Sequence, residues 1–352
     1  MGIDKIYVIG LMSGTSLDGV DLVYVVFDKN AYKSFEILCS ETIPYTKSWK
    51  EKLAKAIHKS KEELLKLDLE YGELLAEKVN KFIRENNILN IDFIASHGHT
   101  ILHQPEKGIT LQIGNGAIIA KNTHNKVVCD FRTQDVKYGG QGAPLVPIGD
   151  KFLFGQYDAC LNLGGFANVS FKEKNKRVAF DICPVNIVLN YYVNKLGFEY
   201  DDKGLIAASG NINTELLEEF NALDFYKTMP PKSLGLEWVQ STIFPIINKK
   251  DIQIKDVLKT FIEHVAIQIA NSTKESKNIF ITGGGVFNEF LIKRIRYYSK
   301  SEIIIPDAQT VNYKEALIFA FLGLLRVDNQ VNCLSSVTGA KKDHSSGVIF
   351  MP

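Results

Sequence analysis

A run of small and hydroxylated residues, Met12–Gly19, lies between two apolar stretches near the start of the chain. Small residues let backbone N–H groups approach an anion, and the hydroxyls add further donors. A carboxylate beside phosphate oxygens suits hydrated Mg²⁺. The segment is not a Walker loop, because it lacks the Gly-Lys-Thr ending and a strand follows it. A plain hairpin turn, the structural alternative, needs only two to five residues. The residues expected to bind phosphates are Ser13, Gly14, Thr15, Ser16 and Asp18, with Asp18 also holding Mg²⁺.

Two further glycine turns occur in the second half of the chain, at residues 162–168 and 282–288. The first resembles a common Gly-Gly hairpin, but its place matches that of the turn at 12–19, so it is expected to contact the same phosphates. The second follows an apolar strand and opens a helix. Its three glycines allow a flat nucleoside to lie against the backbone, or a strand and a helix to pack closely. It is not the G-x-G-x-x-G dinucleotide fingerprint. The residues expected to bind nucleotide are Gly164, Gly165, Asn168, Gly283, Gly284, Gly285 and Asn288.

Asp181 follows the predicted strand 177–180 and precedes Pro184, which is expected to open a helix that Gly197 closes. A carboxylate at the carboxyl end of a strand is aimed into the cleft typical of α/β proteins. A nearby helix N-terminus would favour its ionised form, which a general base requires. We therefore expect Asp181 to be a catalytic base. The alternative is a helix-capping aspartate.

His97, His99 and His103 suggest a metal site at first sight. However, the segment contains no carboxylate or cysteine, and neutral imidazoles also donate hydrogen bonds to sugar hydroxyls. Sugar contact is therefore favoured over zinc, with a purely structural role as the other alternative.

Charged residues occur at two more places. Asp130 and Arg132 offer a carboxylate and a guanidinium at a predicted hinge, where Arg132 is suited to a substrate carboxylate or to a structural ion pair. Glu315, near the start of an apolar helix, needs a ligand or an ionic partner.

The elements that must position these residues form a duplicated pattern. Each half begins with strand, glycine-bearing turn, strand and strand, at residues 6–11, 20–27 and 35–42 and again at 159–163, 166–171 and 177–181. Amphipathic helices are predicted at 61–87 and 255–272, a strand at 278–282 and a buried helix at 313–326. The likeliest domain junction lies at 130–150. We therefore expect an α/β protein of two lobes with a cleft between them.

Composition narrows the class of protein. The 352 residues suggest about two domains. A formal net charge of +1 argues against nucleic acid or an acidic membrane as the main partner. No apolar run reaches the roughly 18 residues of a membrane helix, and the N-terminus lacks the form of a secretory signal. Five scattered cysteines without a Cys-x-x-Cys pair favour reduced thiols in a cytoplasmic protein.

These motifs, in their order along nearly the whole chain, resemble those of the anhydro-N-acetylmuramic acid kinase family. The resemblance rests on residues 12–19, 96–100 with His103 and Pro105, 110–114, 130–132, 139–147, 161–165, 283–285 with Asn288, 315–316 and 337–340. It implies the actin and hexokinase (ASKHA) fold of two ribonuclease H-like lobes. The lobes are expected at residues 1–130 with 328–352 and at 131–327.

The resemblance also implies an activity in peptidoglycan recycling. The chain is expected to convert 1,6-anhydro-N-acetylmuramic acid, ATP and water into N-acetylmuramic acid 6-phosphate and ADP. ATP and Mg²⁺ are the implied cofactors, a cytoplasmic homodimer is the expected form, and Asp181 matches the family's catalytic aspartate. The implied sugar contacts are His97, Thr100, Asp130, Arg132 and Glu315.

Two departures from the family pattern occur. The family usually has Asp-Thr-Gly-Pro-Gly-Asn around its base, whereas this chain has Asp181-Ile-Cys-Pro-Val-Asn186, and His99 replaces a usual glutamine. The alternatives are a kinase for another sugar and a non-catalytic actin-like nucleotide-binding protein. A plain glycosidase would leave the phosphate-type turns without a purpose.

Overall fold

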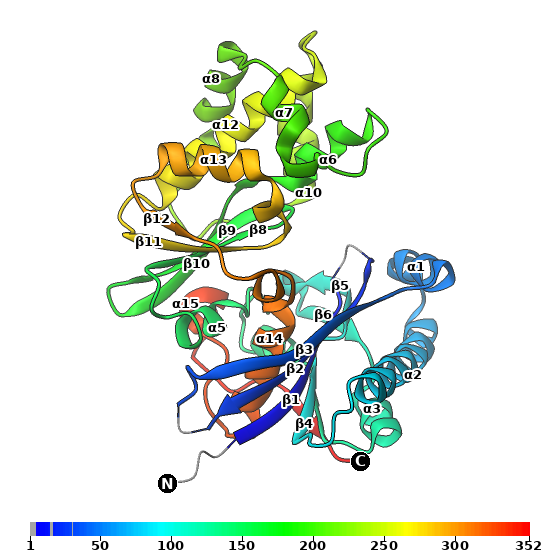
Figure 1. The fold of residues 1–352 in the computed structure, drawn as a ribbon. Coiled ribbons are helices and arrows are strands. Elements are labelled where there is room, and N and C mark those ends of the chain that lie inside the picture. The colour runs from blue at the N-terminus through cyan, green and yellow to red at the C-terminus, as the bar shows by residue number, and fades with distance from the viewer. Residues whose placement is uncertain (1–4, 15–16, 30) are drawn as a thin grey trace. The chain divides into compact units, whose positions relative to one another are not determined.

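The computed structural model describes residues 5–14, 17–29 and 31–352, which form two compact units (Figure 1). The first unit combines Met1–Phe154 with Tyr313–Pro352, and the second comprises Gly155–Asn312. Among the described residues, no helix is both long and apolar enough to cross a bilayer.

The first unit is built on a six-stranded sheet in the order β13-β7-β4-β1-β2-β3. β1, β2 and β3 form an antiparallel meander, whereas β4 is parallel to β1 and β7 is parallel to β4. β13 closes the edge antiparallel to β7. The strands are β1 (Lys5–Met12), β2 (Gly19–Asp28), β3 (Phe35–Pro44), β4 (Phe93–Ser96), β7 (Val127–Cys129) and β13 (Val348–Phe350). A separate hairpin pairs β5 (His99–Gln104) with β6 (Ile109–Ile113).

Alternating residues of β1 explain how this sheet is covered. Ile9 and Leu11 point into a core shared with α2, whereas Gly10 contacts α14. α2 begins at a complete capping box formed by Ser60 and Glu63, and its predicted apolar face is buried, as expected. The helices are α1 (Lys47–Ala54), α2 (Lys61–Glu85), α3 (Gly116–Thr123), α4 (Thr133–Lys137), α5 (Pro147–Phe152), α14 (Ala308–Val327) and α15 (Ser335–Thr338).

The second unit repeats this strand order in a five-stranded sheet, β10-β9-β8-β11-β12. Its first three strands are again antiparallel neighbours, and β11 is parallel to β8. The duplicated α/β topology expected of two ribonuclease H-like lobes is therefore confirmed, while the cleft between them stays a prediction. The strands are β8 (Ala159–Leu163), β9 (Phe166–Glu173), β10 (Lys176–Pro184), β11 (Asn278–Thr282) and β12 (Glu302–Ile304).

Helix α12 organises the core of the second unit. Its predicted face of Val257, Phe261, Val265 and Ile269 is buried, and it contacts α6, α7, α8 and α13 (Figure 1). The helices are α6 (Asn186–Asn194), α7 (Leu205–Ser209), α8 (Thr214–Ala222), α9 (Asp224–Lys227), α10 (Leu236–Trp238), α11 (Phe244–Asn248), α12 (Ile254–Ser272) and α13 (Glu289–Tyr298).

Two details differ from the sequence-based expectation. Residues 131–154 pack with the first unit, where Thr338 Oγ1 donates to Asp135 Oδ1 over 2.8 Å and Lys314 pairs with Asp150 at 2.8 Å. The compact units therefore change at 154/155 and 312/313, whereas the lobes were expected to change at 130/131 and 327/328. Pro184 does not open a helix. It is the last residue of β10, and α6 begins at Asn186.

Gly10 sets how closely β1 approaches α14. A Cβ at this position would lie 2.3 Å from the carbonyl oxygen of Ala316, a backbone atom that cannot rotate away. We predict that Gly10→Ala lowers the free energy of unfolding of the first unit by about 1–3 kcal/mol, as overpacking does. Urea unfolding in a Trp238→Phe background, where Trp49 reports on the first unit, measures this loss.

Gly284→Ala is the matched control, because a Cβ there meets no atom within 4 Å. Its unfolding should change by no more than about 0.5 kcal/mol. Equal urea midpoints for wild type and Gly10→Ala would contradict the close approach.

Candidate functional site

In the first unit, candidate residues follow the carboxyl ends of three neighbouring parallel strands, β1, β4 and β7. The backbone N–H of His97, just past β4, donates to the carbonyl of Leu11 in β1 over 3.1 Å. Carboxyl ends of parallel strands share one sheet edge, which explains why the turn after Met12, the histidine segment and Asp130 lie together.

Ser13 is buried within a chain of polar side chains. Its hydroxyl lies 2.6 Å from the Tyr45 hydroxyl and 3.0 Å from His99 Nδ1, and Tyr45 in turn bonds to Tyr71. Burial lowers the pKa of His99 to about 4, so this imidazole is neutral. Sequence reasoning missed Tyr45 and Tyr71, because no local signal brings them to this turn. Thr15 and Ser16 lie outside the described residues, and Gly14 is half-buried beside them.

Asp18 is exposed at the end of the same turn, and its carbonyl accepts from the N–H of Tyr45 over 3.2 Å. Burial raises the pKa of nearby Asp21, a hydrogen bond from Thr42 opposes the rise, and the charge of Asp18 adds to it. Two neighbouring carboxylates are a donor set suited to a hydrated divalent cation. Gly19 keeps the turn tight, since a Cβ there would lie 2.5 Å from the Ile43 carbonyl oxygen.

Arg132 connects the histidine segment to the loop that contains Gly142. Its Nε–H donates to His97 Nε2 over 2.9 Å, and its Nη1 donates to the Gly142 carbonyl over 2.7 Å. His97 is therefore neutral with its proton on Nδ1, which lies 2.9 Å from the Gly98 carbonyl. Burial, together with the charge of Arg132, lowers the pKa of His97 well below its usual value.

Glu315 provides the opposite charge. Burial lowers the pKa of Arg132 to about 10, and the Glu315 carboxylate opposes that shift. The Glu315 side chain is exposed at the surface. Desolvation by the surrounding protein nevertheless raises the pKa of its carboxyl, and the charge of Arg132 lowers it. The charge of each group therefore favours the ionised form of the other.

The remaining two candidates in this unit are held locally. Thr100 Oγ1 accepts from Gln112 Nε2 over 3.3 Å across the β5–β6 hairpin. Asp130 adopts a left-handed backbone with φ of 57°, and its Oδ1 accepts from the N–H of Thr133 over 3.3 Å. His97, His99 and His103 each have separate polar partners, and among the described residues these three belong to no group that could hold a metal ion.

In the second unit, two glycine turns meet at the carboxyl ends of the parallel pair β8 and β11. Gly283 has a φ of +86°, and a Cβ there would lie 2.8 Å from the Leu163 carbonyl oxygen. A Cβ on Gly285 would lie 2.7 Å from Leu163 Cβ. Glycine at 283 and 285 therefore lets the two turns touch, while Gly284 stays open to solvent.

The turn after β8 also holds the start of α6. The carbonyl of Gly165 accepts from the N–H groups of Val185 and Ile187, and that of Gly164 accepts from Asn186. Gly165 remains exposed. Asn288 has a structural function, because its side chain caps α13 by accepting from the N–H of Leu291 over 2.9 Å.

Asp181 lies inside β10 beside a bulge between Asp181 and Cys183. Its Oδ2 accepts from the Leu234 N–H over 2.8 Å, so it does not cap α6. Burial raises the pKa of Asp181, and the hydrogen bond from Leu234 partly offsets that rise. We expected a helix dipole to favour the ionised form of Asp181, but burial has the larger effect on its pKa. A half-buried carboxylate with a raised pKa is a stronger base than an exposed one.

Strand register adds Asn162 and Thr282, the first residues of the two turns, to the candidate residues of the second unit. Asp181 pairs with Asn168, Asn168 with Asn162, and Asn162 with Thr282. This row places one polar side chain on each of four strands beside the glycine turns. Thr282 Oγ1 is fully buried and has no hydrogen-bond partner within the described part of the chain. Only the pairing of distant strands could have shown this row.

Comparisons with known proteins identify relatives over nearly the whole chain. A family model described as anhydro-N-acetylmuramic acid kinase matches residues 6–352. The anhydro-N-acetylmuramic acid kinase of Mannheimia succiniciproducens is 34% identical, covering 98% of this chain and 99% of that protein. The enzyme of the same name from Sulfurimonas denitrificans is 32% identical, with the same two coverages of 98% and 99%.

Among solved structures, the activator of the 2-hydroxyisocaproyl-CoA dehydratase from Clostridium difficile with bound ADPNP is similar at 14% identity and a TM-score of 0.47. The alignment covers 92% of this chain and 97% of that one. The family model and the two full-length relatives together establish that this chain belongs to the anhydro-N-acetylmuramic acid kinase family.

Proposed function

We propose that this protein phosphorylates 1,6-anhydro-N-acetylmuramic acid with ATP while water opens its anhydro bridge. The products are N-acetylmuramic acid 6-phosphate and ADP, which returns a cell-wall sugar to metabolism. The observation that carries the proposal is the half-buried Asp181 carboxylate next to two touching glycine turns, in a chain that matches the kinase family from residue 6 to 352.

In this mechanism Asp181 takes a proton from water as the water oxygen attacks the anomeric carbon. The bond from that carbon to O6 breaks, and O6 forms a bond to the γ-phosphorus of ATP as the bond to the β-phosphate oxygen breaks. The step resembles that of an inverting glycosidase, with phosphoryl transfer to O6 in place of protonation of the leaving oxygen. The raised pKa of Asp181 suits it to accept this proton.

The two glycine turns of the second unit would hold the nucleotide, with Gly164, Gly165 and Gly284 offering backbone free of side chains. The turn at 12–19 would hold phosphates in the first unit. The Ser13 hydroxyl is already engaged by Tyr45 and His99, so its backbone is better placed than its side chain for this contact. Asp18, with Asp21 nearby, would hold Mg²⁺, which neutralises charge on the phosphates when bound.

The sugar would contact residues His97, Thr100, Asp130, Arg132 and Glu315. Arg132 suits the lactyl carboxylate of the muramic acid, because a guanidinium with a pKa of about 10 is charged at neutral pH. A cytoplasmic homodimer remains our proposal from the family resemblance. A kinase for a different sugar is the second candidate, favoured by His99 where glutamine is usual.

The activity itself gives the first test. Purified protein incubated with Mg-ATP and 1,6-anhydro-N-acetylmuramic acid should release ADP and the sugar 6-phosphate in equal amounts. Linked detection of ADP and mass spectrometry of the sugar measure both products. ADP release that depends on another amino sugar would support the second candidate, and ATP binding without any sugar-dependent release would contradict the kinase proposal.

Replacing the base gives the second test. We predict that Asp181→Asn lowers kcat by at least ~10²–10⁴-fold, the usual contribution of a general base. ATP binding measured by calorimetry should stay unchanged, since the nucleotide contacts are elsewhere. Exposed Asp251→Asn is the matched control and should keep wild-type kcat.

The pH profile separates loss of the base from misfolding. Asp181 must be ionised to act, so activity is lost as pH falls through its pKa, which burial raises above the ordinary value of 3.8. The remaining activity of Asp181→Asn should lack this acid limb. Near-native turnover in the variant, or an unchanged acid limb, would place the base elsewhere.

A further inference from the structure

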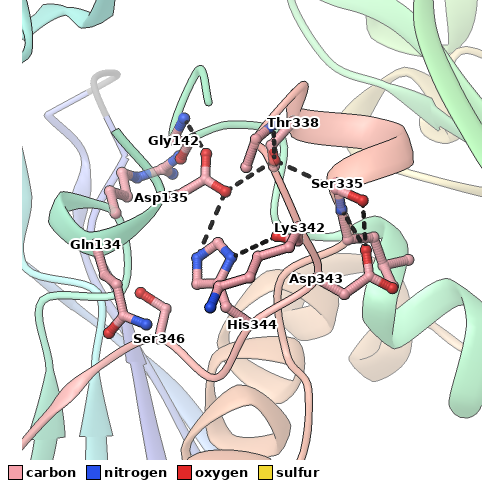
Figure 2. A network of polar contacts seen from close by, with 12 residues as sticks. Gln134, Asp135, Gly142, Ser335, Thr338, Lys342, Asp343, His344 and Ser346 are labelled. Atoms are coloured by element: carbon pink, nitrogen blue, oxygen red, sulfur yellow. Dashed lines mark hydrogen bonds and ion pairs between the residues drawn. The ribbon is translucent and has the colours of Figure 1, made fainter. Parts of the chain in front are cut away.

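Three potential metal ligands from distant parts of the chain, Asp135, Cys333 and His344, meet inside the first unit. Figure 2 shows Asp135 and His344 of this group. Asp135 comes from α4, whereas Cys333 and His344 face each other across a short antiparallel bridge in the C-terminal segment. Their exposed fractions are 0%, 1% and 6%, and one ligand atom from each lies within 4.8 Å of the others. Neither the family resemblance nor the proposed reaction gives this cluster a purpose.

The orientation of His344 indicates which ring nitrogen is available. Nδ1 lies 3.1 Å from the Lys342 carbonyl, an acceptor only, so a neutral ring would carry its proton on Nδ1. Nε2, with its lone pair in that form, faces Asp135 Oδ1 at 3.6 Å and has no hydrogen-bond partner within the described part of the chain. This distance exceeds that of a normal hydrogen bond. A lone pair that faces a carboxylate is repelled unless a cation lies between them.

Asp135 is held in the way that metal-binding carboxylates commonly are. Asp135 Oδ1 accepts from Thr338 Oγ1 over 2.8 Å, and Oδ2 accepts from the Gly142 N–H over 2.7 Å. A Cβ on residue 140 would lie 2.2 Å from that Oδ2, so glycine at this position leaves the room that the carboxylate occupies. Donation of the second imidazole N–H to a backbone carbonyl, and hydrogen bonds that fix the carboxylate, are the usual outer partners of a metal site.

We propose that Asp135, Cys333 and His344 form a binding site for a Zn²⁺-like divalent cation. Tetrahedral zinc with nitrogen and oxygen ligands places those atoms roughly 3.3–3.5 Å apart, close to the 3.6 Å between Nε2 and Oδ1. The widest pair, within 4.8 Å, must close by about 1 Å around the ion. Three protein ligands leave the fourth position to a water molecule.

Binding would change the protonation of the cysteine. Burial, reinforced by the charge of Asp135, raises the pKa of the Cys333 thiol to about 12, so without a cation the sulfur keeps its proton. The cation would bind the thiolate, and the thiol proton would pass to solvent. The bound ion would tie the C-terminal segment to α4, whose first residue follows Arg132.

Cobalt substitution of the full-length protein tests this site. Protein freed of metal with a chelator and titrated with Co²⁺ should bind one equivalent and show a thiolate-to-cobalt charge-transfer band, which Zn²⁺ removes by displacement. Cys333→Ser should lose the band. His344→Asn should weaken Co²⁺ binding by at least ~10-fold, the lower end of what even outer partners contribute.

Cys39→Ser and His124→Asn are matched controls and should keep both the band and the affinity. His124 has a left-handed backbone that asparagine tolerates. The proposal is overturned if wild type shows no band, or if Cys333→Ser keeps it; the cluster would then be a buried imidazolium–carboxylate pair. Should Cys333→Ser not fold, X-ray absorption of zinc-loaded wild type decides: one sulfur neighbour supports the site, and only nitrogen and oxygen neighbours refute it.

Discussion

Parallel pairing of the first and fourth strands in each sheet is the constraint on which both sets of site residues depend. It joins β1 to β4 in the first unit and β8 to β11 in the second. Because carboxyl ends of parallel strands share one edge, each pairing brings a turn near the start of its unit next to a loop far along the chain. The His97–Leu11 hydrogen bond and the contact of Gly285 with Leu163 are the local results.

Local patterns predicted most of the fold because they are properties of short segments. The apolar face of α2, the buried face of α12 and the bounds of β11 all follow from periodicity and glycine positions. Local patterns could not predict which unit contains residues 131–154, because contacts with residues distant in sequence decide this. Thr338, which donates a hydrogen bond to Asp135, is one of these residues. The same holds within the site, where Ser13 meets His99 through pairing that no local signal encodes.

The loop after Asp181 shows how a departure from the family pattern fits the structure. Ile182, Cys183 and Val185 are buried in the apolar core of the second unit, and β10 continues through Ile182 and Cys183 to Pro184 instead of a helix opening there. Their burial explains why side chains replace the small family residues here, since each one adds apolar area removed from water. The same apolar surroundings raise the pKa of Asp181. The departure is therefore compatible with the base that we propose at this position.

The central step of the proposed mechanism is the attack of water on the anomeric carbon. Asp181 activates this water, and O6 receives the phosphoryl group. Reaction in ¹⁸O-water followed by mass spectrometry of the sugar product tests this step directly. We expect one ¹⁸O atom at the anomeric hydroxyl and none in the phosphate. After correction for exchange of free N-acetylmuramic acid 6-phosphate in the same water, absence of label at the anomeric carbon would contradict the mechanism.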